Sequence, residues 1–308
     1  MREPEPVALA ATVTPPAAGI VADKGVETEA RARLGVVGRL AIGWLAFVVI
    51  ASVFAPWLPF DEPNALGTRS LGPPGGDAWF GTDGAGRDVF ARVIWGGRAS
   101  LLVGVSAVTI GMVVGGALGL VAGYVRGWVE TMLVTLFDTL LAFPQLVLAL
   151  ALVSVFASGD DISSVRRLLV LISALGTVAV PILARISRAN TLVWAQREFV
   201  TAARAMGATN RSILGREVLP NVLPAMFSIG LLGVAVAIVA EGGLSLLGVG
   251  VQLPTPSWGN IIAEGRATIT AAPHAIFFPA LFIFLTVLAL NYLGDVVRAR
   301  FDVREKVL

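Results

Sequence analysis

Residues 198–224 read EFVTAARAMGATNRSILGREVLPNVLP, a charged and helix-prone stretch that lies between two hydrophobic runs of the chain. Its first half predicts a helix, because apolar residues recur at helical spacing on one face. These residues are Phe199, Ala202, Ala203 and Met206. Gly207 follows, and glycine is the residue type that most readily takes the left-handed conformation ending a helix. The small residues on this face would let the surface of another protein approach the backbone closely.

The second half of the stretch predicts another short helix. Thr209 or Asn210 can cap its N-terminus, since both side chains accept hydrogen bonds from backbone N–H groups. Apolar residues then repeat at helical spacing until Leu219-Pro220, where we expect the helix to end; they are Ile213, Leu214 and Val218. The whole stretch therefore predicts a small helix-turn-helix that is presented to a partner protein.

The composition indicates the kind of chain that carries this loop. Of its 308 residues, 56% are hydrophobic and 14% are charged, and the mean hydropathy is +0.81, which is typical of polytopic membrane proteins. The absence of cysteine excludes disulfides and thiolate metal sites. The sequence pI is about 9.5, but the arginines are spread beside apolar runs. We therefore attribute them to membrane topology and expect no nucleic-acid partner.

Six uncharged runs are long enough, or nearly so, to cross a hydrocarbon core that needs roughly 20 helical residues. They are 40–58, 99–125, 139–159, 168–184, 218–240 and 275–294, with the third expected to begin near Thr131 and the fifth to continue to about Gly248. The fold class predicted from them is all-α, a membrane bundle of six transmembrane helices.

Lysine and arginine are divided unequally between the two sides of these spans. With a cytoplasmic N-terminus, the inner segments hold 16 of them and the outer segments hold 7, which favours both termini in the cytoplasm. The predicted organisation is a disordered cytoplasmic tail, 1–38, and a transmembrane domain, 39–308. That domain includes an outer loop, 59–98, and a cytoplasmic loop, 187–221.

The outer loop ends in GTDGAGRDVFARVIWGGRASL, residues 81–101. GTDGAGRD lacks the spacing of a calcium loop and does not join a strand to a helix as a dinucleotide site would. It is therefore interpreted as a structured loop. Val89, Arg92, Val93 and Ile94 predict a short amphipathic helix on the outer surface before the second span.

Residues that could carry enzymatic chemistry are few. Lys24 and Lys306 are the only lysines, and neither lies in a Gly-rich phosphate loop, so the chain is not expected to hydrolyse ATP. The single histidine, His274, is interpreted as a residue at the boundary of the sixth span rather than a ligand or base. A transport or binding role is favoured over catalysis.

Several residues within the spans have structural consequences. Gly111, Gly115, Gly119 and Gly123 recur every four residues, which predicts close helix packing within the chain rather than a dimer seam. Pro144 and Pro181 are expected to kink the third and fourth spans, which hints at a water-filled pathway.

Asp138 and Glu241 are the ionisable residues placed within the membrane. Charged groups there face the bundle interior, a partner or water. Both are candidates for a pathway or gate, and hydrogen bonding between helices of the fold is the alternative.

The stretch that begins at Glu198 resembles the EAA signature of ATP-binding-cassette (ABC) importer permeases, E-A-A-x3-G-x9-I-x-L-P. Ala202, Ala203, Gly207, Leu219 and Pro220 match it, whereas Thr201 replaces the Glu and Glu217 replaces the Ile. The segments beginning at Gly81, Asp138, Glu241 and Asn291 resemble the C-type permeases of dipeptide and oligopeptide importers, and together they cover most of residues 80–302. The resemblance implies coupling to an ATPase through Thr201, Ala202, Ala203, Arg204, Met206, Gly207, Leu219 and Pro220, with Ala203 facing the ATPase.

The resemblance also implies a bacterial plasma-membrane complex. Its other members would be a homologous second permease, two ATPase subunits that bind ATP and magnesium, and an extracytoplasmic substrate-binding protein; this chain itself would bind no cofactor or metal. The expected substrates are di- and oligopeptides, with nickel chelates or glutathione-like peptides as the alternative. An ion-gradient-driven transporter would not need the cytoplasmic loop, and an intramembrane enzyme would need paired catalytic groups.

Overall fold

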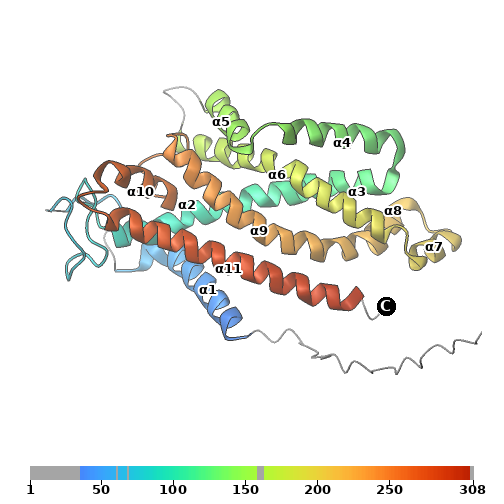
Figure 1. Cartoon of the computed structure of the whole chain (residues 1–308), viewed down its shortest axis with the longest axis horizontal. Helices are drawn as coiled ribbons and strands as arrows, with labels where there is room; N and C mark the ends of the chain where they lie inside the picture. Colours follow the sequence, from blue (N-terminus) through green and yellow to red (C-terminus); the bar gives the residue numbers. More distant parts are fainter. Residues whose placement is uncertain (1–34, 60–61, 68, 158–162, 306–308) are drawn as a thin grey trace, which may run out of the picture. The chain divides into compact units, whose positions relative to one another are not determined.

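The computed structural model describes residues 35–59, 62–67, 69–157 and 163–305, with side chains up to residue 300. Within these ranges the chain is helical, and its β-structure is limited to an isolated bridge between Thr82 and Asp88 (Figure 1). The α-helices are α1 Val36–Phe54, α2 Val89–Ile110, α3 Gly116–Val125, α4 Gly127–Ala142, α5 Gln145–Phe156, α6 Ser164–Trp194, α7 Glu198–Ala205, α8 Asn210–Ile213, α9 Leu219–Leu246, α10 Trp258–Gly265 and α11 His274–Glu305. Short 3-10 turns (η1 Ala55–Trp57, η4 Arg266–Thr268) and π turns (η2 Gly111–Gly115, η3 Leu214–Val218) join some of them. The predicted tail, 1–38, lies outside the described residues except at 35–38, where α1 has already begun.

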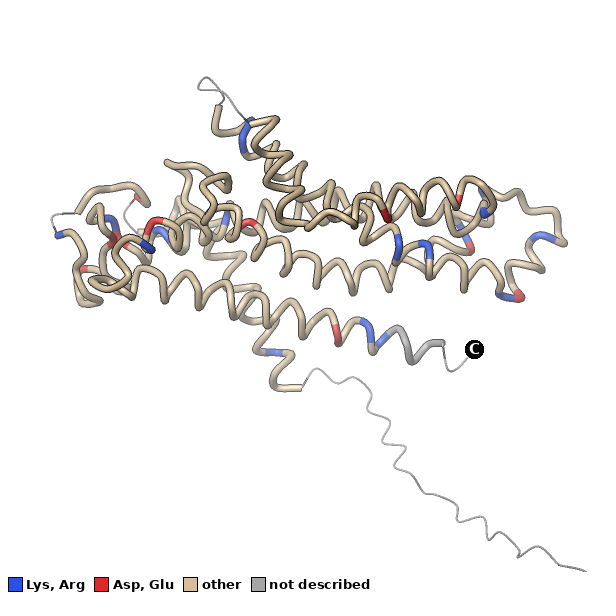
Figure 2. The backbone as a smooth tube through the Cα atoms, turned by 45° about the horizontal axis from the view of Figure 1, so that its top comes forward, with Lys and Arg blue, Asp and Glu red and all other residues tan. Residues whose placement is uncertain are grey.

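Five helical runs are long and apolar enough to cross a membrane, and a bent pair of helices provides a sixth. The runs are Val36–Trp57, Val89–Val125, Ser164–Trp194, Asn210–Leu246 and His274–Arg300, and the bent pair is α4 with α5. The predicted number of six is therefore reached when the bent pair forms one span. In Figure 2 the charged residues gather toward the ends of the helices, and their middle stretches carry few.

The third span is broken rather than merely kinked. Helices α4 and α5 meet at 88° across the break that contains Phe143 and Pro144. Pro144 precedes the first residue of α5 and has no N–H to continue the ladder of α4, so the break falls where proline predicts it. Helix α6, in contrast, continues through Pro181.

The second span begins earlier than expected, and the predicted separate surface helix is wrong. Val89 is the first residue of α2, a helix that continues without a break into the membrane-spanning stretch. Asp88 caps it by accepting a 2.8 Å hydrogen bond from Phe90 N. Arg92 and Val93 are fully buried instead of lying on a surface. An arginine can be buried there because Asp83 Oδ2 lies 2.6 Å from its Nη1.

The glycine stripe of the second span packs against α6, as Figure 1 shows for α3. A Cβ added at Gly115 or Gly119 would collide with the carbonyl oxygens of Val180 or Ala184. Ser187 of α6 also donates a 2.7 Å hydrogen bond to Gly116 O. Helices in lipid gain their association from such close backbone contact. The interpretation of the stripe as intramolecular packing is therefore confirmed.

Candidate functional site

Helices α7 and α8 form the predicted helix-turn-helix. Gly207 has φ +85°, the left-handed conformation that glycine adopts readily. Around it Gly207 N bonds Arg204 O at 3.0 Å, and Ala208 N bonds Ala203 O at 3.0 Å, the paired bonds of a Schellman helix end. Thr209 then caps α8 by accepting a hydrogen bond from Ser212 N at 3.4 Å. The turn is thus fixed by backbone bonds on both sides of Gly207.

The inner face of this loop has an apolar core of its own. Val200, Ala203, Ile213 and Val218 are all buried, and they belong to the main hydrophobic cluster of the chain. The side chain of Ala203 is 8% exposed and turns inward with Val200, three residues earlier. Its contact with an ATPase stays a prediction.

The outer face of the loop carries exposed apolar side chains. Met206 is 82% exposed and Phe199 is 38% exposed. Of the other residues assigned to this site by the signature, Thr201, Ala202, Arg204, Gly207 and Pro220 are exposed and Leu219 is half-buried. The loop therefore presents a mixed surface of apolar, small and cationic groups.

Leu219-Pro220 does not end the second helix, so that expectation is wrong. Leu214–Val218 forms a π turn, and α9 starts directly at Leu219, giving a continuous helical run from Asn210 to Leu246. Pro220 lies in the first turn of α9, where a missing N–H is tolerated. In a regular α-helix the proline ring would clash with the carbonyl group four residues earlier. The wider π turn before Pro220 shifts that carbonyl group away from the ring.

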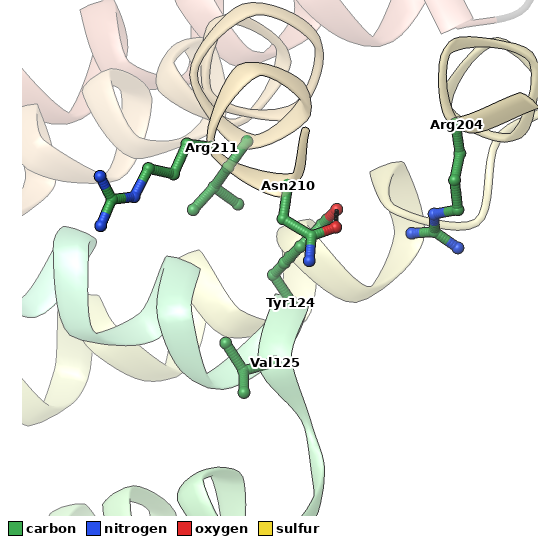
Figure 3. Close-up of a pocket in the computed structure, with 6 residues that line it drawn as sticks. Tyr124, Val125, Arg204, Asn210 and Arg211 are labelled. Atoms are coloured by element: carbon green, nitrogen blue, oxygen red, sulfur yellow. Dashed lines mark hydrogen bonds between the residues drawn. The ribbon is translucent and has the colours of Figure 1, made fainter. Parts of the chain in front are cut away.

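A pocket of about 470 Å³ lies between the end of α3 and this loop. It is lined by Tyr124, Val125, Arg204, Asn210, Arg211 and Leu214. Tyr124 donates a 2.9 Å hydrogen bond to Asn210 Oδ1, which ties α3 to α8. Figure 3 shows the side chains of Arg204 and Arg211 on opposite sides of Asn210. Both arginines are exposed, so the pocket rim is cationic and suits an acidic side chain of a partner.

Glu241 is fully buried near the C-terminal end of α9. Ser245 and Ser257 donate hydrogen bonds to its Oε1 at 2.8 and 2.9 Å, and Ser100 lies 3.5 Å from Oε2. Ser100 also accepts a 3.1 Å hydrogen bond from Trp258 N. The carboxyl group therefore connects α9, α2 and the start of α10, which is the arrangement expected for hydrogen bonding inside the fold.

Asp138 has a different environment. It lies on α4 and pairs with Arg185 of α6, and the two side chains are 50% and 52% exposed. The structure thus places the two candidate acidic residues in unlike settings. Glu241 is enclosed by hydroxyl groups, whereas Asp138 is open on one side.

A cluster of four charged residues, which joins the start of α2 to α10, was not predicted. Arg87 and Arg92 each contact both Asp83 and Glu264, with N–O distances of 2.5 to 3.1 Å. Asp83 also accepts hydrogen bonds from Ala85 N and Arg87 N, which confirms that GTDGAGRD is a structured loop. The i, i+4 spacing of Asp83 and Arg87 signalled part of the cluster, but nothing in the sequence pointed to Glu264. Among the described residues no group of three or more His, Cys, Asp or Glu side chains is placed to hold a metal ion.

The family described as "Binding-protein-dependent transport system inner membrane component" matches residues 115–307. The chain belongs to this family. The permease is accordingly a multi-pass membrane subunit of an ABC importer, and such a subunit works with ATPase and substrate-binding partners.

Individual relatives agree with this assignment. The permease is 40% identical over 265 residues to the "Glutathione transport system permease protein GsiD" of Escherichia coli O6:K15:H31 (strain 536 / UPEC), covering 85% of each chain. The same identity and coverage hold for the protein of that name from Shigella boydii serotype 4 (strain Sb227). Among solved structures, it resembles a chain of the inward-facing MetNI methionine ABC transporter, with a TM-score of 0.53 and 20% identity, covering 68% of this chain and 96% of that one. At that identity the likeness concerns the fold.

Proposed function

We propose that this permease pairs with a homologous second permease to form the pathway for ATP-driven uptake of di- and oligopeptides. Two ATPase subunits would bind ATP and magnesium, and this chain would bind neither. The alternative of an ion-gradient-driven transporter is disfavoured, because such a protein has no use for an ATPase-docking loop.

The observation that carries the proposal is the outer face of the α7–α8 loop. Met206 and Phe199 are exposed together on a turn that backbone hydrogen bonds fix, and this apolar surface supports a docking role. Arg204 and Arg211 add a cationic rim to it. The loop is continuous with α9, so a displacement by a docked ATPase would reach the membrane without passing through a flexible linker.

The substrate class follows from the relatives. The name of GsiD assigns that protein to glutathione transport, and glutathione is itself a small peptide with free charged groups. We therefore include glutathione-like peptides among the proposed substrates. Nickel chelates remain the second candidate class, because the permeases that this sequence resembles include importers of such chelates.

The proposed orientation places both termini and the α7–α8 loop in the cytoplasm of a bacterial cell. The division of 16 to 7 lysines and arginines supports it. The hydrogen bond between Tyr124 and Asn210 supports it as well. This bond puts the end of α3, next to Arg126, on the same side of the membrane as the α7–α8 loop. The outer loop and α10 would then meet the substrate-binding protein.

The test is transport by the whole complex in proteoliposomes. The permease is purified with its second permease and ATPases, and uptake of labelled dipeptides and of glutathione is measured with the binding protein outside. We expect uptake that requires ATP, stops when the ATPase is inactivated by substitution, and ignores proton and sodium gradients. Uptake driven by an ion gradient without ATP would contradict the proposal. A second arm with nickel chelates distinguishes the substrate classes.

A further inference from the structure

The ion pair between Asp138 and Arg185 lies deep within the membrane-spanning helices. At 1.5 Å per residue, Asp138 is about 17 Å along α4 from Gly127 and Arg185 is about 14 Å along α6 from Trp194. Both groups therefore lie between the ends of helices that are long and apolar enough to cross a hydrocarbon core about 30 Å thick, α6 alone and α4 together with α5. Charged side chains at such a depth face protein or water, because lipid cannot solvate them.

The pair has hydrogen-bonding capacity that the described residues do not use. Among them, the contact between Arg185 Nη2 and Asp138 Oδ1 is the one polar interaction recorded for either side chain. The second carboxylate oxygen and the other guanidinium donors are left for another group. The neighbouring pair differs, since Arg188 contacts Glu130 through both Nε and Nη2 and the side chains are only 31% and 21% exposed.

A row of polar residues extends the pair along α4. Thr131 and Thr135 are exposed and lie on the same side of the helix as Asp138, seven and three residues before it. Met132 and Leu136, also exposed, occupy the adjacent face. The exposed surface of α4 is therefore divided between an apolar side and a side that carries the Asp138 carboxylate beside two threonine hydroxyls, each of which donates to the backbone carbonyl four residues earlier.

We infer that this polar row lines the translocation pathway, and that Asp138 and Arg185 form a subsite for a zwitterionic peptide. The carboxylate of Asp138 would receive an ammonium group of the peptide, and the guanidinium of Arg185 would receive a carboxylate. A solute that carries both charges matches the free donors and acceptors of the pair. The inference rests on the proposed function and adds to it the residues that meet the substrate.

Water access is the first test. The chain has no cysteine, so Thr135→Cys and Leu136→Cys introduce single thiols on the two faces of α4, in complexes whose partners carry no reactive thiol. We expect a charged, membrane-impermeant thiol reagent to modify Thr135→Cys at least ten times faster than Leu136→Cys, with a rate that changes when ATP is added. Equally slow modification of both in every nucleotide state would overturn the inference, because the row would then be covered by lipid or by the second permease.

Charge selectivity is the second test. Uptake of a lysine-containing and a glutamate-containing dipeptide is compared at saturating loaded binding protein. Asp138→Asn should lower the lysine-to-glutamate ratio of uptake rates several-fold, and Arg185→Gln should raise it. Glu130→Gln is the control, because it weakens an ion pair between the same two helices at a more covered position and should leave the ratio unchanged.

The outcomes separate the inference from the proposed function. If Asp138→Asn and Arg185→Gln slow both peptides by the same factor, the pair only holds α4 to α6 and the subsite is refuted. If the wild-type complex takes up no peptide with ATP, the proposed function fails first. Thermal unfolding of each variant complex shows whether a loss of uptake reflects a loss of structure.

Discussion

Ser257 donates a 2.9 Å hydrogen bond to Glu241, and this contact joins the residue that caps α10 to a buried carboxyl group of α9. Ser257 also caps α10, because its side chain accepts a 3.1 Å hydrogen bond from Asn260 N while Ser257 N donates a 2.9 Å hydrogen bond to Asn260 Oδ1. The same hydroxyl therefore starts one helix and fixes it to another. Loss of the carboxyl group would disturb both.

Replacing Glu241 tests this connection. Glu241→Gln keeps an acceptor oxygen for Ser245 and Ser257, so we expect the complex to assemble normally. Glu241→Leu leaves buried hydroxyl groups without their partner, at about 1–3 kcal/mol for each group. The thermal unfolding midpoint of the purified complex should fall clearly for the leucine variant and little for the glutamine variant. Equal midpoints for leucine and wild type would show that these hydrogen bonds contribute nothing.

The packing of α3 on α6 predicts an unusual sensitivity to one methyl group. Gly119→Ala would force a Cβ against the backbone oxygen of Ala184, and overpacking of this kind destabilises by about 1–3 kcal/mol. Gly43→Ala, in α1, is the matched control because nothing lies within 4 Å of the added Cβ. Yield and unfolding midpoint in lipid nanodiscs should fall only for Gly119→Ala. Wild-type yield and unfolding midpoint for Gly119→Ala would show that α3 and α6 can move apart to accommodate the added methyl group at little cost.

A substitution at the turn between α7 and α8 is expected to impair the coupling of ATP hydrolysis to transport rather than the assembly of the complex. Gly207→Val places a branched side chain at φ +85°, which costs about 1–2 kcal/mol and disfavours the observed turn. Gly215→Ala is the control in the same loop, since its Cβ meets nothing and its backbone is not left-handed. Substrate-stimulated ATPase and uptake are measured side by side. We expect uptake per ATP to fall for Gly207→Val alone, and full coupling would exclude the turn from signal transmission.

The proposed orientation predicts which residues are accessible from outside the cell. Leu66 and Met206 are 76% and 82% exposed, and each can become the single cysteine of the permease. An impermeant maleimide added to intact cells should label Leu66→Cys and spare Met206→Cys, whereas both should react after the membrane is opened and the ATPase subunits are removed. The reverse pattern would invert the topology and remove the α7–α8 loop from the cytoplasm.

Much of the fold could be predicted because lipid makes hydrophobic length informative. The spans, the turn at Gly207 and the glycine stripe all follow from local residue properties. What the sequence did not predict depends on contacts between distant segments. The charge of Arg92 favours a surface helix when the sequence is considered alone. In the structure Arg92 is buried, and Asp83 and Glu264 compensate its charge.

The α7–α8 loop also shows that contacts between segments decide which residues are buried, here between segments close in the sequence. Helical periodicity placed Phe199, Ala203 and Met206 on one face, but an eight-residue helix allows more than one choice of buried stripe. In the structure Ala203 turns inward with Val200 toward Ile213 and Val218, and Phe199 and Met206 stay exposed. The sequence predicts a helix end at Pro220 because the π turn that precedes it has no clear sequence signal.

The continuous run from Asn210 to Leu246 makes the docking loop and the outer end of α9 parts of one rod. At 1.5 Å per residue the rod is about 55 Å long, so a tilt of about 5° displaces one end by about 5 Å relative to the other. Glu241 rides near the far end and carries α10 with it through Ser257. If an ATPase binds the α7–α8 loop as proposed, a tilt of this rod would move the loop and the opposite end of α9 in opposite directions in a single movement.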